Sequence, residues 1–115
     1  MEALIKAALN DLVDGRVYPD VTPDNPPLPL IVYQQVGGID YVYVDKESPN
    51  HENARVQVYV WADSRMEARR IARQARNNIM KKILKSEPVG APTSLHHPEL
   101  NRYGTRQDFS IWYKY

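Results

Sequence analysis

Residues 53–68 have the sequence NARVQVYVWADSRMEA, and this stretch decides the fold because it contains a strand and the beginning of a helix. Every second residue from 54 to 60 is alanine or valine, which is the period of a strand with one face in the core. Tyr59 and Trp61 fall on the other face. The stretch therefore predicts a strand over residues 53–62 that buries one face and carries aromatic rings on the other.

The second half of this stretch predicts where a long helix begins. Ser64 and Glu67 have the capping-box spacing, in which the two side chains satisfy backbone N–H groups left unpaired at a helix start. Apolar residues then recur at helical spacing until Pro88 and Gly90 interrupt the pattern. We predict a helix over residues 64–85, with a core stripe made of Ala68, Ile71, Ala72, Ala75, Ile79 and Ile83.

The N-terminal part of the chain predicts a second helix and a connector. Apolar residues recur at helical spacing as far as Val13, and Gly15 follows as a natural C-terminal stop. Residues 2–14 therefore predict an amphipathic helix. Residues 18–29 are rich in proline, which excludes regular structure and predicts an extended connector across the surface.

The other segments predict strands and loops. Residues 30–44 contain two apolar runs around a Gly-Gly pair and predict a hairpin. Residues 45–52 are polar, with no periodic apolar face, and predict an exposed loop. After the long helix, residues 93–97 predict a short strand, and alternation over residues 107–115 predicts a C-terminal strand with one buried face.

The composition is that of an ordinary folded domain, with 115 residues of which 43% are hydrophobic and 25% are charged. We predict a single α+β domain, with a largely antiparallel sheet of four to five strands and two helices packed on one face. The absence of cysteine excludes disulfides and thiol chemistry. No apolar run approaches the roughly 20 residues that a membrane span needs, and we expect a cytosolic protein.

The net charge of +1 hides a strongly basic long helix. The surface outside its core stripe carries, opposed only by Glu67, the cations Arg65, Arg69, Arg70, Arg73, Arg76, Lys81 and Lys85. Such a surface could follow a phosphate backbone, because phosphate contacts need positive charge rather than base-specific geometry. The alternative is a solvated basic face, and no helix-turn-helix or RNA-binding sheet motif accompanies the charge. An accessory protein that binds nucleic acid through residues 65–85 is therefore an alternative function.

One sector of this helix, opposite the core stripe, combines methionine with arginine. The 3.6-residue period places in this sector Met66, Arg73, Met80 and Leu84. With the neighbouring Arg69, these residues predict a contact with a subunit or partner, because methionine and arginine are enriched in protein interfaces. Scattered surface residues are the alternative. The rings of Tyr59 and Trp61 pose a similar choice, between a small cluster within the domain and a contact with a neighbouring subunit.

The histidines are the candidate metal ligands of this sequence. His96 and His97 are adjacent, and adjacent strand residues point to opposite faces, so both could bind one ion only in an irregular segment. His51, with Asp45, Glu47 and Glu52 nearby in the polar loop, is a second weak candidate. The same loop is predicted separately as a partner contact, through Asp45, Lys46, Glu47, His51 and Glu52. Neither place has a recognised ligand spacing, so a metal-dependent hydrolase ranks last. We predict no catalytic, cofactor-binding or metal-binding residue.

Four blocks of sequence follow one another along nearly the whole chain. They are MEALIKAAL (1–9) with RVYPD (16–20), PLIVYQQVGG (29–38), NARVQVYVWA (53–62) and QDFSIWY (107–113). Any one block is compatible with many β proteins. Together they resemble the tail completion protein family of long-tailed bacteriophages and prophages.

The resemblance implies a structural, non-enzymatic role without cofactors or membrane contact. Members of the family look like tail terminators, which form a ring, usually of six subunits, on the head-proximal end of the tail tube. The implied partners are further copies of the chain, the tail tube protein and the head connector protein, with DNA passing through the lumen without sequence-specific binding. The implied locations are the host cytoplasm during assembly and then the virion tail. Ring closure needs two different surfaces on each subunit, and the Met66/Arg73/Met80/Leu84 sector could supply one.

Overall fold

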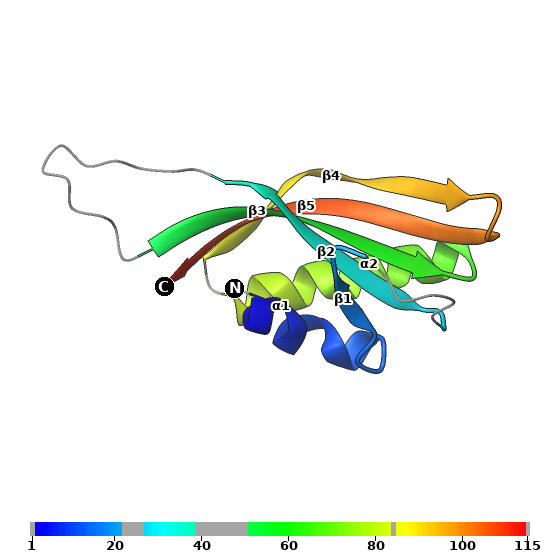
Figure 1. The fold of residues 1–115 in the computed structure, drawn as a ribbon, viewed down its shortest axis with the longest axis horizontal. Coiled ribbons are helices and arrows are strands. Elements are labelled where there is room, and N and C mark those ends of the chain that lie inside the picture. Colours follow the sequence, from blue (N-terminus) through cyan, green and yellow to red (C-terminus); the bar gives the residue numbers. More distant parts are fainter. Residues whose placement is uncertain (1, 22–26, 39–50, 84, 115) are drawn as a thin grey trace, which may run out of the picture.

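One mixed sheet packs against two helices in this chain (Figure 1). The computed structural model describes residues 2–21, 27–38, 51–83 and 85–114. In chain order the elements are α1 (Glu2–Leu9), a 3₁₀ turn (Asn10–Leu12), β1 (Val17–Pro19), β2 (Leu30–Gly37), β3 (His51–Ala62), α2 (Arg65–Lys82), β4 (Ser86–His97) and β5 (Arg102–Lys114). This confirms the predicted α+β class.

The sheet has the strand order β1-β2-β3-β5-β4. The long pair of β3 and β5 forms its centre, in register from His51 opposite Lys114 to Ala62 opposite Tyr103. β2 and β4 are antiparallel to their neighbours, whereas the short β1 pairs with β2 in parallel. The sheet is therefore largely antiparallel, with β1 and β4 as its two edges.

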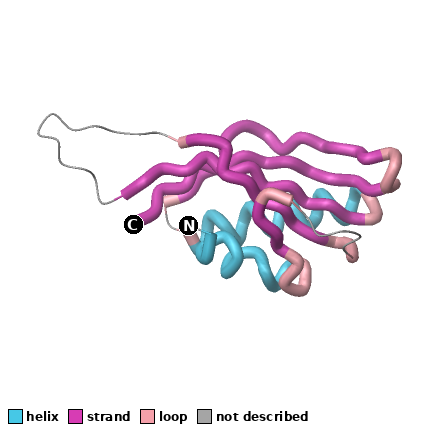
Figure 2. The backbone as a smooth tube through the Cα atoms, viewed as in Figure 1, coloured by secondary structure: helices cyan, strands magenta, loops and turns pink. Residues whose placement is uncertain are grey.

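Both helices cover the same face of the sheet, and the opposite face has no helical cover (Figure 2). The core lies between the two layers. It joins alternate residues of β3 and β5 to apolar residues of the helices, including Ile5, Leu9, Val56, Ile71, Ile79, Phe109 and Ile111. Alanines on α2 help the helix axis to approach the strands closely, since Ala68 and Ala75 are both buried there. None of the helices in the described ranges is both long and apolar enough to cross a membrane.

The α2 helix begins at the cap that the sequence predicts. The Ser64 hydroxyl accepts a hydrogen bond of 3.2 Å from the backbone N–H of Glu67, which satisfies one of the unpaired donors at the helix start. At the other end, Ser86 Oγ lies 2.6 Å from the carbonyl oxygen of Ile83 and 3.1 Å from that of Ile79. Both ends of the helix are thus closed by serine side chains.

The first helix is shorter than the predicted 2–14. Its α-helical part ends at Leu9, and the chain tightens into a 3₁₀ turn over Asn10–Leu12. Asp14 and Gly15 then adopt positive φ angles of 50° and 79°, a left-handed conformation that terminates helices. The predicted stop at Gly15 is present, but the last helical turn takes the tighter geometry that is common at helix ends.

Two segments that are predicted to be irregular contain strand residues. The predicted connector 18–29 begins within β1, whose residues Val17–Pro19 pair with β2. Proline fits there because an edge strand leaves one side of its backbone free of ladder hydrogen bonds. The predicted loop 45–52 ends inside β3, since His51 and Glu52 pair with β5. The predicted return strand of the hairpin, 39–44, and residues 45–50 lie outside the described residues. Within the described ranges, β2 pairs with β3.

The C-terminal strands are longer than predicted. β4 begins at Ser86 rather than at residue 93, and β5 begins at Arg102 rather than at residue 107. Pro88 and Pro92 lie within β4, which the edge position permits, and the register with β5 shifts between Val89 and Thr93. The prolines therefore accompany a bulge and do not end the strand.

Candidate functional site

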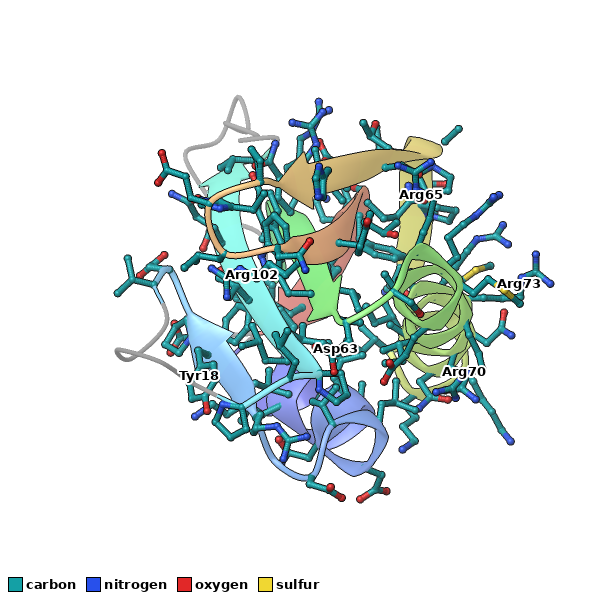
Figure 3. The ribbon with its side chains drawn as sticks, turned by 90° about the vertical axis from the view of Figure 1, so that its right-hand side faces the viewer. Tyr18, Asp63, Arg65, Arg70, Arg73 and Arg102 are labelled. Atoms are coloured by element: carbon teal, nitrogen blue, oxygen red, sulfur yellow. The ribbon has the colours of Figure 1, made fainter. Side chains whose placement is uncertain are left out.

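The methionine and arginine sector lies on the solvent side of α2. Met66 is 84% exposed and Met80 is 43% exposed, and Arg69 and Arg73 are exposed as well. Arg73 projects from α2 away from the sheet, whereas Tyr18 of β1 lies on the opposite side of the molecule (Figure 3). Leu84 falls outside the described residues. Two exposed methionines beside arginine give this surface the composition of a contact region.

Positive charge on α2 has few partners within the chain. The helix carries Arg65, Arg69, Arg70, Arg73, Arg76, Lys81 and Lys82 against Glu67. Among the described residues the two ion pairs are Arg16 with Asp14 and Arg55 with Asp108, neither of which involves α2. The Arg65 guanidinium lies 5.8 Å from the ring centre of Tyr103, which is a cation–π distance.

A cleft of about 380 Å³ separates α2 from the edge strand β4. One wall is formed by α2, the other by the bulged part of β4, and the base by β5. The lining residues are Arg69, Ala72, Arg73, Arg76, Pro88, Gly90, Ala91, Pro92, Ser94, Thr105 and Gln107. This cleft is absent from the sequence-based predictions. The available sequence signal for the bulged wall is Gly90 between two prolines. The sequence-based prediction assigns this pattern to the end of the helix and not to a bulge in a strand.

Gln107 holds the bulged wall of the cleft in place. Its side-chain amide donates hydrogen bonds of 2.9 Å to the Gly90 carbonyl and 3.3 Å to the Val89 carbonyl. Gly90 has a φ of +73°, a conformation that suits glycine. Thr105 lies deeper and is 3% exposed, and its hydroxyl has no hydrogen-bond partner among the described residues. The cleft is therefore preformed and has an unsatisfied hydroxyl at its base.

The open face of the sheet holds Trp61 in a cluster of its own. The Arg102 guanidinium lies 5.0 Å from the ring centre of Trp61, and His97 meets the ring edge-on at 6.4 Å. The indole also covers Gly104, where an added Cβ would lie 2.7 Å from a ring carbon. Tyr59 is half-buried, and its hydroxyl donates a 2.8 Å hydrogen bond to Gln57 Oε1. Both rings thus have contacts within the chain.

The two adjacent histidines face opposite sides of the sheet. His96 stacks on Tyr103 with ring centres 4.6 Å apart, on the side that faces α2. His97 contacts Trp61 on the open face, and its Nδ1 accepts a 3.3 Å hydrogen bond from the Leu100 N–H. In the described part of the chain, no group of three or more potential metal ligands gathers. The strand geometry separates the two imidazoles, as the alternation of strand side chains predicts.

The predicted partner loop is mostly outside the described residues. This holds for Asp45, Lys46 and Glu47, while His51 and Glu52 are described only as backbone positions of β3. A second hollow, of about 570 Å³, lies at the start of α1 and is likewise absent from the sequence-based predictions. It is lined by Glu2, Ala3, Asp20, Tyr33, Gln35 and Tyr113. The two carboxyl groups make this hollow acidic, in contrast to the arginine-lined cleft.

Tyr33 is the one described group with a clearly displaced pKa. Burial raises the pKa of its hydroxyl above the usual 10.0, and the nearby carboxylates of Glu2 and Asp20 raise it further. The side chain is 2% exposed, and the hydroxyl has no hydrogen-bond partner among the described residues. The hydroxyl therefore remains protonated at neutral pH and is buried at some cost.

Comparison with known proteins identifies the family. The model of the family described as tail completion protein gp17 matches residues 2–114. None of the curated proteins compared with the chain matches it. The family is a structural phage tail family whose members interact with other tail or head components. Because the match covers the whole described domain, the chain belongs to the tail completion protein gp17 family of bacteriophages.

Proposed function

We propose that this phage tail completion protein terminates the tail by forming a ring on the head-proximal end of the tail tube. The ring, of six subunits as the family resemblance implies, stops tube polymerisation and binds the head connector, and DNA passes through its lumen without sequence-specific contacts. The observation that carries the proposal is the family match over residues 2–114. The role is structural and needs no cofactor or catalytic residue. The protein acts in the virion tail after assembly in the host cytoplasm.

The shape and charge of the domain support this role. A closed ring with head-to-tail contacts needs two different surfaces on each subunit. The chain exposes a basic side along α2 and, at the opposite edge of the sheet, the short strand β1 near the acidic hollow. These two sides differ in sign of charge and in secondary structure. Opposite charges on the two sides would favour one orientation of neighbouring subunits over the reverse.

The residues proposed for these contacts are those with exposed apolar or aromatic surface. On α2 they are Met66, Arg69, Arg73 and Met80, joined by Leu84 through the helical period. On the sheet they are Tyr59 and Trp61, whose rings are partly exposed. A further proposed contact with the tail tube or the connector is the segment that contains Asp45, Lys46, Glu47, His51 and Glu52, the last two of which begin β3.

Electron microscopy of tails made with and without this protein tests the terminator role. We expect tubes of irregular and excessive length in its absence, because nothing stops the addition of tube subunits. Such tubes should also fail to join heads. Tails of normal, uniform length in the absence of the protein would contradict the proposal.

A pair of charge-matched variants tests the α2 sector. Arg73→Glu with Met80→Asp should prevent ring formation, because both positions are exposed on the sector. The control is Arg70→Glu with Gln74→Asp, which makes the same change in charge at exposed positions. These positions share a helix stripe with Asn78, whose side chain contacts the Ala8 carbonyl of α1. Complementation of tail assembly measures both variants. If the first pair assembles as well as the control, the sector is not part of the ring contact.

The basic helix favours one alternative function, which is nucleic-acid binding. The seven cations of α2 make no ion pair with the described residues, and such a surface would attract phosphates. This alternative predicts DNA binding whose affinity falls steeply as the salt concentration rises. A salt titration with duplex DNA tests it. Weak binding at low salt that Arg70 and Arg73 substitutions leave unchanged would exclude the basic helix as the site.

A further inference from the structure

Three arginines line the cleft between α2 and β4 without a carboxylate to balance them. Arg69, Arg73 and Arg76 are spaced by four and three residues, so they are neighbours on one face of α2. None of them forms an ion pair or a hydrogen bond with the described residues. Like charges at these spacings destabilise a helix. An anionic occupant of the cleft would remove that repulsion.

The base of the cleft offers a hydrogen-bond donor that the chain itself does not use. Thr105 lines the cleft, is 3% exposed, and its hydroxyl has no partner among the described residues. A buried hydroxyl without a partner costs free energy that a bound acceptor would recover. The unpaired arginines and this hydroxyl are independent observations, and an acceptor group in the cleft would satisfy both.

The cleft also has an apolar component that distinguishes between anions. Ala72, Pro88, Ala91 and Pro92 contribute to its walls, and they suit the methylene groups of a glutamate or aspartate side chain. The phosphates of duplex DNA lie on a convex surface and are bound by exposed cations, without need of a preformed apolar cavity. Because Gln107 fixes the bulged wall, the cleft is shaped before any partner arrives.

We propose that this cleft binds carboxylate side chains of an extended acidic segment of a partner protein. The arginines donate charge-assisted hydrogen bonds to the carboxylates, and the Thr105 hydroxyl donates at the base. An extended segment fits because it can continue from the cleft along the Thr93–His97 half of β4, whose outer edge has no strand partner in the described sheet. The site itself does not depend on the terminator role. The identification of the partner as a neighbouring tail or head protein rests on the proposed function.

Fluorescence anisotropy with a short labelled oligoglutamate peptide tests the site directly. We expect saturable binding, and no binding of an oligoglutamine peptide of the same length. Arg69→Gln with Arg76→Gln should weaken binding about tenfold or more, because it removes two charge-assisted hydrogen bonds. The control is Arg70→Gln with Lys81→Gln, which removes the same charge from exposed positions that do not line the cleft. We expect the control to bind within about twofold of the parent.

A second variant separates the cleft from a general attraction of charge. Thr105→Val keeps the side-chain shape and removes the unsatisfied hydroxyl. We expect it to lower peptide affinity several-fold while leaving the thermal midpoint unchanged or higher. The inference is overturned if both double variants weaken binding equally, or if Thr105→Val binds as the parent does. It is also overturned if duplex DNA or inorganic phosphate displaces the peptide more effectively than free oligoglutamate does.

The two proposals fail in different experiments. Peptide binding decides the carboxylate site, whereas tail length decides the terminator role. If tails need the protein but Arg69→Gln with Arg76→Gln completes them normally, the cleft is not the contact with a tail or head protein. If the parent protein binds the peptide and tails are normal without it, the cleft stands and the terminator role falls.

Discussion

The two faces of the sheet have different contents, although the same strands build both. On the face covered by the helices, β3 presents Val56, Val58 and Val60, all buried. On the open face, the alternate residues of β3 include Arg55, Tyr59 and Trp61, which contact their neighbours through an ion pair, a hydrogen bond and ring contacts. Core packing and surface contacts therefore belong to alternate residues of one strand, so residues of one face can be substituted without changing the other face.

The magnitudes explain this division. A fully buried aromatic side chain contributes several kcal/mol to stability, whereas an exposed ion pair contributes about 0–1 kcal/mol. The 2.8 Å contact of Arg55 with Asp108 belongs to the second class, because the Arg55 side chain is 51% exposed. We therefore expect the free energy of unfolding to depend mainly on the covered face.

Phe109→Ala should produce the largest effect. The side chain is 1% exposed and belongs to the core between sheet and helices. Its loss should lower the free energy of unfolding by about 3–5 kcal/mol, since it removes buried apolar surface and leaves a cavity. Urea unfolding followed by circular dichroism measures the change. The control is Tyr59→Ala, which removes an aromatic ring from the open face. It should lower the free energy of unfolding clearly less.

Gly104→Val tests whether the open face contains one tightly packed place. A Cβ at this position would lie 2.7 Å from the Trp61 ring. We therefore expect the free energy of unfolding to fall by about 1–3 kcal/mol. Thermal unfolding provides the measurement. Adding Trp61→Ala removes the obstacle and should recover part of the loss. If the double variant is no more stable than Gly104→Val alone, the Trp61 contact is not the cause.

The Arg55–Asp108 ion pair should have a small effect. A double-mutant cycle with Arg55→Ala and Asp108→Ala is expected to give a coupling energy of about 0.2–1 kcal/mol that decreases with added salt. A coupling energy above about 2 kcal/mol would place the open face among the main sources of stability. It would remove the distinction between the two faces.

Tyr33→Phe should change the free energy of unfolding least at neutral pH. At alkaline pH the change should be measurable. The unfolded chain releases this proton near pH 10, whereas burial raises the pKa of Tyr33 in the folded protein. Its contribution to stability is therefore complete below about pH 10 and is lost as the pH rises from there through the folded pKa. Unfolding free energies at rising pH should fall less steeply for Tyr33→Phe than for the parent. Equal slopes would contradict the assignment.

The elements best predicted from the sequence are those whose signals are local. The alternating valines of β3 and the Ser64 cap of α2 lie within a few residues of the structure they specify. Helical periodicity also placed Met66 and Met80 on an exposed side of α2, where the structure has them. The strand and helix at the centre of the fold could therefore be deduced without tertiary information.

Sequence signals whose meaning depends on the neighbouring strands gave wrong predictions. Pro88 and Pro92 were interpreted as breakers because proline excludes interior strands, and only the sheet order shows that β4 is an edge. The cleft could not be deduced for the same reason. Its arginines come from α2, its bulge from β4 and its buried hydroxyl from β5. No period or spacing along the chain indicates that these three segments meet.

The prolines of β4 have a further consequence for the uncovered edge of the sheet. An uncovered strand edge is a template for unwanted fibril growth. Pro88 and Pro92 each lack the N–H that a foreign strand would need, and the bulge between them bends the backbone away from a flat ladder. The first half of this edge is therefore guarded against aggregation, which leaves the Thr93–His97 half as the place where a strand could still add.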